Sequence, residues 1–411
     1  MLGVKKQPAL TPYPGYPRLV YVGDVPVEAS HHGSALLHRL LCNRSGDTLR
    51  VVEGSPWQSQ PERRISGIEY RLLRVAQPRL HNSRLSRFYA TWLTAVAHFR
   101  TAALSRALEG FNPEAVLTVV HGYSWITAAH YARRAGLPLH LICHDDWPRT
   151  STLHPSMSSW LDRKLRRTYR QAASRLCVSP TMRAFYRDRF GVDGEVLYPS
   201  RAVDCPVFDE PAERLSRPGR DLTFAFAGTF YEESISGLKQ LSAPVAAIGG
   251  RILAFGPISE TDFARVGLDR MPIERGGLLK SADLIRRLRS EADVMYLPTD
   301  FGESGRTAVE ANFPSKLTDY TATGLPILIH GPPWGSAVRW AAENPGVAEV
   351  VQKPDDSCLA AAVNRLANSP ELRLRLARRA LDVGKVYFSY AAAQAAFDNA
   401  LLRGCPVTAQ D

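Results

Sequence analysis

The sequence has little cysteine for its length, and the cysteines that it has are scattered. Six occur in 411 residues, and no two of them form a C-x-x-C pair. Domains that depend on disulfides carry dense, regularly spaced cysteines, whereas scattered ones are typical of a reducing compartment. We therefore expect neither a disulfide framework nor a zinc site built from cysteine, and we expect a cytoplasmic protein. The six are Cys42, Cys143, Cys177, Cys205, Cys358 and Cys405.

Long hydrophobic runs are also missing. No segment approaches the roughly 18 consecutive apolar residues that a membrane-spanning helix needs. Near the N-terminus, Lys5 and Lys6 are followed by Pro8, Pro12 and Pro14 and not by an apolar core, so we do not expect a signal peptide there.

Acidic residues are fewer than basic ones. The chain has 51 Lys and Arg against 40 Asp and Glu, which gives a formal net charge of +11. Such an excess suits an anionic partner, for example nucleic acid, acidic lipid or a phosphorylated substrate. The hydrophobic content of 45% is ordinary for a folded protein. The length suits two or three domains of about 150 residues each.

One stretch near the C-terminal third carries the strongest signal. Residues 313–329 read FPSKLTDYTATGLPILI. Pro314 predicts the first turn of a helix and Gly324 predicts its end. The backbone amides around Ser315 would then be unpaired donors, and Lys316 adds a positive charge at the same place. A helix N-terminus of this kind suits a phosphate group.

This stretch resembles the donor-binding motif of glycosyltransferase family 4, which commonly reads P-S-K-L-x-E-Y-x-A-x-G-x-P. The alternative is an ordinary helix-to-strand unit of any α/β protein. The combination of P-S-K, a spaced acid and a G-L-P exit favours the resemblance. The words VSPTMRAFYRDRFG and VLYPS, at the end of the first half of the chain, resemble the same family.

The resemblance implies the GT-B fold, an α/β architecture of two facing Rossmann-like domains with a cleft between them. We predict an N-terminal acceptor-side domain over 1–205, a C-terminal donor-side domain over 206–385, and a helix over 386–411 that crosses back. A linker is predicted over 200–219. Apolar runs predict buried strands over 18–23, 48–53, 115–120, 139–143, 175–179, 222–227, 251–255, 293–297, 325–329 and 347–351.

In the first domain, ligands of parallel sheets are expected at the carboxyl ends of the strands. His121 follows one predicted strand, and in the family a histidine there faces the donor sugar; a buried structural histidine is the alternative. Gly33, in the loop after the first strand, corresponds to a glycine that approaches the donor or acceptor. Asp145 follows another strand, in the sequence HDDW, either as an acceptor contact or as a loop cap.

No metal ion is expected. Adjacent histidines such as His31 and His32 rarely face the same way, and no third ligand is evident near them. The acid pair Asp145 and Asp146 resembles the metal-binding acids of another glycosyltransferase fold, but those follow a different topology. Helix amides and Lys316 already offset a diphosphate charge.

In the second domain, the sequence departs from the family pattern near Gly228. The family usually has Gly-Arg there and a lysine soon after, but here Thr229 replaces the arginine and the nearest lysine is Lys239. This leaves Lys316, the Ser315 amides and either Arg275 or Arg306 for the diphosphate. Residues 271–277, around Ile273, correspond to the segment that holds the nucleotide base.

A second departure concerns the acids. Asp319 matches the second acid of the family, but the position eight residues earlier is Ala311, so the first acid is absent. Glu310 or Glu303 could substitute for it. The predicted donor-binding residues are Gly228, Thr229, Ile273, Glu310, Pro314, Ser315, Lys316, Leu317 and Asp319.

The resemblance implies transfer of a sugar from a nucleotide-diphosphate donor to a glycan or lipid-linked acceptor, as in polysaccharide biosynthesis. It implies retention of the anomeric configuration and neither a metal nor a further cofactor. His121 and Lys316 are the predicted catalytic residues, and Asp319 is predicted to accept hydrogen bonds from the ribose. One alternative is a catalytically impaired GT-B-like protein that binds membranes or polyanions. Another two-Rossmann enzyme, such as an epimerase, does not fit the P-S-K-L-x-D-Y wording, and no nucleic-acid motif is present.

A basic region precedes the third strand. Nine arginines, Arg74 among them, stand between Arg63 and Arg106 against the single acid Glu69. Two interpretations stay open: the apolar stripe within this region packs on the domain, or it forms a peripheral contact with an anionic membrane on its cytoplasmic face. The stripe has helical spacing and consists of Leu85, Phe88, Trp92, Val96, Phe99 and Ala103.

Overall fold

The computed structural model describes residues 16–404, apart from 31, 56–57, 74–78, 81–82, 148–152 and 218–220. The predictions that fall on the N-terminal lysines and prolines, His31, Arg74 and Cys405 therefore lie outside the described residues, as does the side chain of His32. The chain divides into two compact units. One is Ser200–Tyr390, called here the C-terminal unit, and the N-terminal unit contains the described residues before and after it.

The N-terminal unit is built on a parallel sheet of seven strands in the order β3-β2-β1-β4-β5-β6-β7. Its central strands are mostly apolar and are buried along their whole length, as expected of a parallel sheet that is covered on both faces. The strands are β1 (Leu19–Gly23), β2 (Leu49–Glu53), β3 (Glu69–Leu72), β4 (Ala115–Val119), β5 (Leu139–Cys143), β6 (Ser174–Cys177) and β7 (Glu195–Val196).

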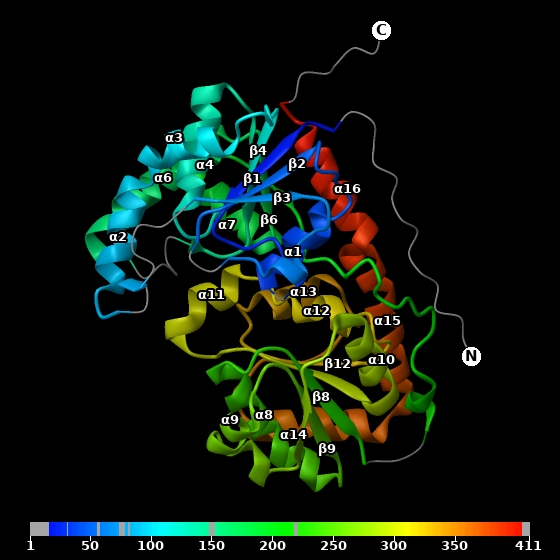
Figure 1. Ribbon diagram of the computed structural model, residues 1–411. Coiled ribbons are helices and arrows are strands. Elements are labelled where there is room, and N and C mark those ends of the chain that lie inside the picture. The colour runs from blue at the N-terminus through cyan, green and yellow to red at the C-terminus, as the bar shows by residue number, and fades with distance from the viewer. Residues whose placement is uncertain are drawn as a thin grey trace. The chain divides into compact units, whose positions relative to one another are not determined.

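Helices cover this sheet (Figure 1). The last of them, α16, comes from the far end of the chain and belongs to the N-terminal unit from Ala391 onward. Its residues Ala393, Phe397 and Leu401 lie in the same hydrophobic core as β1 and β4. The helices are α1 (His32–Leu41), α2 (Ser86–Val96), α3 (Thr101–Ala107), α4 (Ser124–Ala135), α6 (Ser158–Gln171), α7 (Pro180–Phe190) and α16 (Tyr390–Leu401).

The C-terminal unit has a second parallel sheet, of six strands in the order β10-β9-β8-β11-β12-β13. Its core contains aromatic residues from β8 and aliphatic residues from the helix α14. The strands are β8 (Thr223–Ala227), β9 (Arg251–Phe255), β10 (Ile273–Gly277), β11 (Val294–Pro298), β12 (Ile327–His330) and β13 (Glu349–Val351). The helices are α8 (Glu232–Ala247), α9 (Glu260–Arg265), α10 (Ser281–Glu291), α11 (Arg306–Ala311), α12 (Lys316–Tyr320), α13 (Ser336–Glu343), α14 (Asp356–Asn368) and α15 (Pro370–Phe388).

All of the predicted strands are present, and the α/β prediction of two Rossmann-like sheets is confirmed. The strands that were not predicted are β3, β7 and β10, and each of them lies at the edge of its sheet. Edge strands are only partly buried, so their sequences, such as EYRL in β3, lack a continuous apolar run.

The predicted linker over 200–219 is not a solvated connection. Arg201, Cys205, Ala212 and Leu215 are all buried. Arg214 forms an ion pair with Asp293, with 2.8 Å between Nε and Oδ1. The described residues of this stretch therefore pack onto the C-terminal unit, in spite of the prolines that suggested a linker.

Candidate functional site

The carboxyl ends of three neighbouring strands in the C-terminal unit meet at a row of glycines. Gly228 follows β8 and Gly256 follows β9, and their amides donate to the carbonyls of Phe255 and Gly277, both at 2.9 Å. Gly228 has a φ of 153° and Gly256 a φ of 150°, values that side chains rarely allow. A Cβ atom added at Gly256 would lie 2.0 Å from the Gly228 carbonyl oxygen. This edge of the sheet therefore has no room for side chains at these positions.

Lys316 lies across this row. A Cβ atom at Gly228 would stand 2.2 Å from its Cε and 3.3 Å from its Nζ. The Lys316 amine also lies 5.1 Å from the centre of the Phe226 ring, in a cation–π contact. Burial lowers the pKa of Lys316, and the charge of Glu233 in the first turn of α8 opposes that shift. Gly228 and Lys316, which are far apart in the sequence, thus form one surface.

The spacing of Lys316 and Tyr320 explains how α12 is held. Residues four apart lie on one face of a helix. The Tyr320 hydroxyl donates to the Ala227 carbonyl at 3.1 Å and accepts from the Ala227 amide at 2.8 Å. Lys316 and Tyr320 therefore both contact the end of β8, one through its amine and the other through its hydroxyl.

The predicted helix from Pro314 to Gly324 is shorter in the structure. α12 has five residues, and turns continue from it to Gly324, whose φ is 70°. The amides of Leu317 and Thr318 donate to the carbonyls of Pro314 and Ser315, both at 3.1 Å. Within the described residues, the amides of Ser315 and Lys316 have no acceptor. Such a short helix has a small dipole, so Lys316 and these two amides are the main positive groups here.

The other predicted donor-side residues lie around α12 and α11. Ser315 is exposed and Pro314 and Asp319 are half-buried. Asp319 accepts a hydrogen bond from Ser281 at 3.3 Å. Glu310 forms an ion pair with Arg339 at 2.9 Å.

Two predicted donor-side residues turn their side chains into the protein. Ile273 is 5% exposed and Leu317 is fully buried. Any contact that these residues make with a nucleotide would therefore use main-chain atoms. Thr229 is half-buried beside Gly228.

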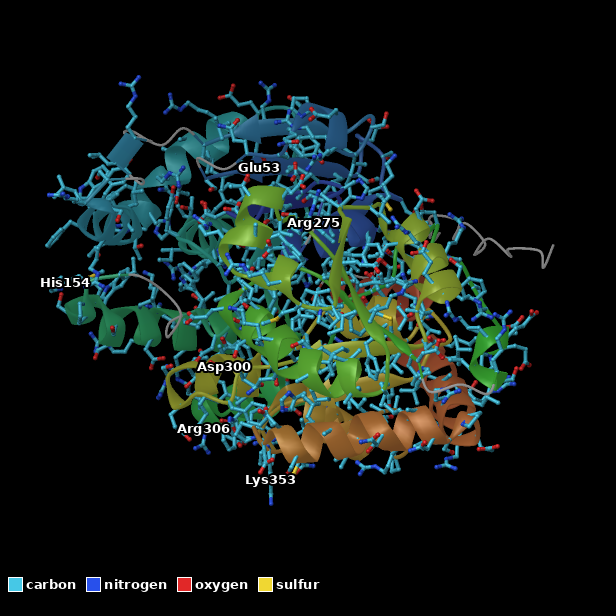
Figure 2. The ribbon with its side chains drawn as sticks, turned by 90° about the horizontal axis from the view of Figure 1, so that it is seen from below. Glu53, His154, Arg275, Asp300, Arg306 and Lys353 are labelled. Carbon is cyan, nitrogen blue, oxygen red and sulfur yellow. The ribbon has the colours of Figure 1, made fainter. Side chains whose placement is uncertain are left out.

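Of the two arginines suggested for the diphosphate, each is exposed and has a partner (both are labelled in Figure 2). Arg275, on β10, donates to the Ile258 carbonyl at 3.4 Å. Arg306, on α11, pairs with Glu303 at 3.3 Å and lies over the Trp334 ring. Neither contacts Lys316, so Lys316 is the cation that the structure places against Gly228.

Sequence reasoning missed a buried arginine that anchors α12 and the turn after it through hydrogen bonds. Arg201 is 3% exposed. Its guanidinium donates to the Thr318 carbonyl at 3.1 Å and to the Thr321 hydroxyl at 3.0 Å. Arg201 lay in the predicted linker, and its buried position depends on tertiary packing, so no local pattern could have indicated it.

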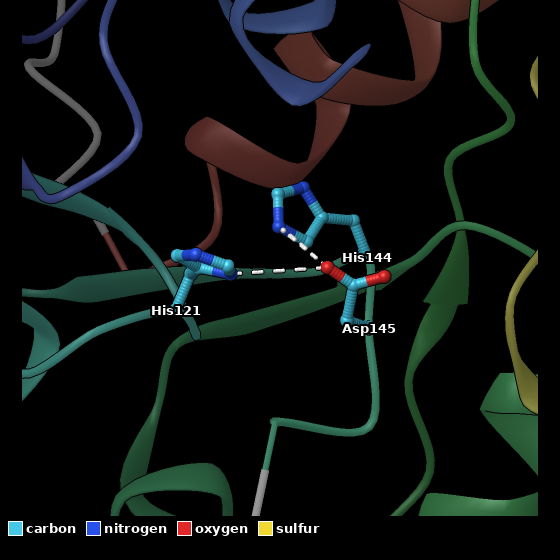
Figure 3. A group of neighbouring side chains, drawn as sticks. All are labelled: His121, His144 and Asp145. Carbon is cyan, nitrogen blue, oxygen red and sulfur yellow. Dashed lines mark ion pairs between the residues drawn. The ribbon is translucent and has the colours of Figure 1, made fainter. Parts of the chain in front are cut away.

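The N-terminal unit brings together the predicted acceptor-side residues. His121 follows β4, Asp145 follows β5, and Figure 3 shows their side chains converging with that of His144. Asp145 Oδ2 lies 3.8 Å from His121 Nδ1 and 3.4 Å from His144 Nε2. A Cβ atom at Gly33 would stand 2.6 Å from His144 Cε1, so Gly33 also lies at this cluster. His144 was not predicted, although it stands beside Asp145 in the sequence HDDW.

Asp24, another residue that sequence reasoning missed, fixes the loop that carries His121. It is buried at the end of β1. Its carboxylate accepts from the Tyr123 and Ser124 amides at 2.6 and 2.7 Å and from the Ser124 hydroxyl at 2.6 Å. Gly122 has a φ of 63°, and a Cβ atom there would lie 2.2 Å from Asp24 Oδ2. This acid and glycine set the direction in which the chain leaves His121.

The apolar stripe that runs from Leu85 along α2 into the 3-10 helix Ala97–Arg100 is mostly exposed. Relative exposures are 57% for Leu85, 62% for Phe88, 50% for Trp92 and 74% for Phe99, residues that we call the aromatic face. The helix instead packs through Tyr89 and Leu93. The interpretation in which this stripe packs on the domain is therefore wrong. Along the described part of the chain, every helix is too short or too polar to cross a bilayer.

Comparison with known proteins agrees with this architecture. Residues 36–204 match the family model described as Glycosyltransferase Family 4. No curated protein matches the sequence significantly.

Solved structures match almost the whole chain. HepE from Anabaena, in complex with UDP, is 13% identical with a TM-score of 0.63, over 93% of this chain and 99% of that one. Sucrose-phosphate synthase from Thermosynechococcus elongatus is 11% identical with a TM-score of 0.65, over 93% and 98%. A UDP-forming trehalose-phosphate synthase from Burkholderia vietnamiensis is 16% identical with a TM-score of 0.60, over 93% and 99%.

At these identities the structural matches establish the fold, and the family model matches most of the N-terminal unit. Both agree with the resemblance that the motif over residues 313–329 indicated in the other unit. The chain therefore has the GT-B fold, and its residues 36–204 are similar to glycosyltransferase family 4.

Proposed function

We propose that this protein transfers a sugar from a nucleotide-diphosphate donor, bound at the C-terminal unit, to a glycan or lipid-linked acceptor bound at the N-terminal unit. The observation that carries the proposal is the Lys316 side chain across Gly228, beside the unpaired amides of Ser315 and Lys316. A cation and two N–H donors at the carboxyl end of a parallel strand suit an anion.

The state of Lys316 supports an anionic ligand. Burial disfavours the charged amine, which is why its pKa lies below the ordinary value. A diphosphate in contact with the amine would restore the favourable interactions that burial removes. The carboxylate of Glu233 already stabilises the charged amine in part. A donor phosphate would therefore have to interact with the amine more strongly than Glu233 does.

The solved structures support a uridine nucleotide among the possible donors. HepE was solved with UDP and also with UDP-glucose. We extend this to the present chain because the two share the fold over nearly their whole lengths.

In the proposed reaction, negative charge builds up on the leaving diphosphate as its bond to the sugar breaks. Lys316 and the adjacent amides would stabilise that charge, which is often the largest single contribution to catalysis. Asp319 would accept hydrogen bonds from the ribose hydroxyls, and His121 would face the sugar. We propose retention of configuration and no metal ion or cofactor at the diphosphate, as the family resemblance implies.

The acceptor side includes a candidate membrane contact. The aromatic face projects from α2 next to the exposed Arg84 and Arg87. The outer surface of α6 adds the exposed Arg163, Arg166 and Arg170. Exposed aromatic residues flanked by arginines suit the interface of an anionic bilayer. We therefore propose peripheral association with the cytoplasmic face of a membrane, where lipid-linked acceptors of polysaccharide biosynthesis would be available.

The departures from the family pattern favour one other function, a catalytically impaired protein that binds membranes or polyanions. Thr229 and Ala311 replace the usual arginine and first acid. Glu310, the nearest substitute for that acid, is engaged by Arg339. This second candidate predicts no response to nucleotide sugars, whereas the first requires one.

The two candidates are separated by nucleotide binding and turnover. Ligands that bind only the folded state raise the melting temperature, so UDP, GDP and their sugars can be screened by thermal shift. We expect at least one to stabilise the protein and its sugar to be transferred or hydrolysed. Lys316→Ala should lower turnover by about 10² or more.

Lys239→Ala is the matched control, because Lys239 is an exposed lysine on α8 of the same unit. It should leave turnover unchanged. A protein that responds to none of these nucleotides, or a Lys316→Ala variant with normal turnover, would contradict the proposed transfer.

A further inference from the structure

The cluster at the carboxyl ends of β4 and β5 has the donor set of a metal site. His121, His144 and Asp145 each offer one atom, and these atoms lie within 4.8 Å of one another (Figure 3). Two imidazole nitrogens and one carboxylate oxygen are a common ligand set for zinc and for other first-row divalent metals. In the described part of the chain, this is the group of three His, Cys, Asp or Glu side chains whose ligand atoms lie this close together.

The distances suit an ion better than a direct hydrogen bond. His121 Nδ1 is buried and has no hydrogen-bond partner among the described residues. It faces Asp145 Oδ2 across 3.8 Å, which exceeds the length of a hydrogen bond to oxygen. In a tetrahedral zinc site, bonds of about 2.0 to 2.1 Å place neighbouring ligand atoms roughly 3.4 Å apart. The 3.4 Å between His144 Nε2 and Asp145 Oδ2 matches this.

The surrounding residues hold the Asp145 loop and the His121 ring in place. The neighbour of Asp145, Asp146, is fully buried and pairs with Arg189 at 3.4 Å. The main-chain carbonyl of Asp145 accepts from the Tyr186 hydroxyl at 3.3 Å. Trp147 covers His121, with 4.5 Å between ring centres. These contacts fix the loop that carries Asp145 and limit the movement of the His121 ring.

From these observations we infer that His121, His144 and Asp145 bind one divalent transition-metal ion, with zinc the best match. His121 and Asp145 are 38% and 36% exposed, so an ion can enter from solvent. Three protein ligands leave a coordination position for an oxygen atom, from water or from a hydroxyl or phosphate of an acceptor. The ion would engage His121, the residue proposed above to face the sugar, but its binding can be measured whether or not the proposed transfer takes place.

Direct metal binding by the full-length protein tests the inference. After treatment with a chelator and removal of that chelator, the protein is titrated with ZnCl2 in competition with a chromophoric indicator. We expect one zinc ion per chain at this site. His121→Ala and Asp145→Asn should each weaken its binding by at least about 100-fold, because losing only a supporting contact already costs 10- to 100-fold.

Cobalt(II) supplies a readout that a merely structural role would not change. Its visible absorption should show imidazole coordination in the wild-type protein and lose it in His121→Ala. His144→Ala serves as a second ligand variant, and circular dichroism in the presence of chelator checks that each variant is folded.

His154→Ala and Asp188→Asn are the controls, because they remove a histidine and a carboxylate outside the cluster. They should keep the wild-type affinity and spectrum. Zinc binding that is absent from the wild-type protein, or equally strong in the ligand variants and the controls, would overturn the inference.

Discussion

At the scale of single residues, the contact between Gly228 and Lys316 joins two parts of the chain that sequence analysis treats separately. The Cε methylene of Lys316 occupies the space that a side chain at position 228 would need. The position of the Lys316 side chain therefore depends more on Gly228 than on the replacement of the family's arginine by Thr229. Lys316 reaches the end of β8 because Tyr320, one helical turn later, is hydrogen-bonded to Ala227.

A substitution at this glycine tests the contact. Gly228→Ala places a Cβ atom 2.2 Å from the Lys316 Cε, so the lysine has to move. We expect the affinity for the best nucleotide diphosphate, measured by calorimetry, to fall by at least about tenfold, the value of one charge-assisted hydrogen bond.

Gly249→Ala is its control, because Gly249 also has a positive φ, of 72°, but a Cβ atom there meets nothing within 4 Å. That variant carries the backbone strain without the clash, and its nucleotide affinity should match the wild-type value. Equal losses in both variants would show that strain, and not the position of Lys316, is responsible.

At the scale of elements, the loop between β4 and α4 depends on one buried carboxylate. Asp24→Ala would leave the amides of Tyr123 and Ser124 without their acceptor. We expect the free energy of unfolding, measured with urea, to fall by about 3 kcal/mol, since each bond to a charged group contributes about 1.5 to 3 kcal/mol and the losses overlap.

Asp24→Asn retains one carbonyl oxygen as an acceptor and should lose clearly less stability. If the alanine and asparagine variants were equally stable, the carboxylate would not be what holds this loop.

The exposed face of α2 is a second feature that belongs to the scale of elements. Phe88→Ser combined with Trp92→Ser removes two exposed rings from the aromatic face. We expect binding to vesicles of phosphatidylglycerol, measured by co-sedimentation at low salt, to weaken at least about tenfold, because inserting one such ring contributes on the order of 1.5 to 3 kcal/mol.

Leu278→Ser is the control for this double variant, because Leu278 is 72% exposed but lies in the C-terminal unit. It should bind these vesicles as the wild-type protein does. Equal binding of the wild-type protein to neutral and anionic vesicles would argue against the membrane contact altogether.

At the scale of the whole molecule, a buried histidine should make stability depend on pH. His140, on β5, is fully buried and lies 2.8 Å from the Ser174 hydroxyl. Burial lowers the pKa of His140 from 6.5 to about 4, and the charge of Arg44 adds to the shift. In the unfolded chain this histidine takes up a proton near pH 6.5, whereas in the folded protein it stays neutral until about pH 4. Its contribution to stability is therefore complete above pH 6.5 and is lost as the pH falls to 4.

The expected size follows from linkage, which gives on the order of 3 kcal/mol across that pH range. Urea denaturation at several pH values should show a steeper fall for the wild-type protein than for His140→Gln. Parallel curves for the two proteins would mean that His140 does not carry this pH dependence.

How much the sequence determined can be seen from particular elements. The central strands β1, β4, β5 and β8 were predicted because burial on both faces requires continuous apolar runs, and the pattern is local. The P-S-K-L-x-D-Y segment is likewise a continuous stretch of sequence, so the resemblance to glycosyltransferase family 4 could be recognised without the structure. The edge strands β3, β7 and β10 escaped prediction because a half-buried strand needs no such run.

The tertiary structure decided which distant residues meet. It brought the Lys316 side chain against Gly228 and the Arg201 guanidinium to the Thr318 carbonyl of α12. It also brought His121 together with His144 and Asp145. It also turned the stripe of α2 outward, although its spacing alone fits an inward face equally well. Periodicity reports only that one side of a helix differs from the other, and only packing against the rest of the chain determines which side is buried.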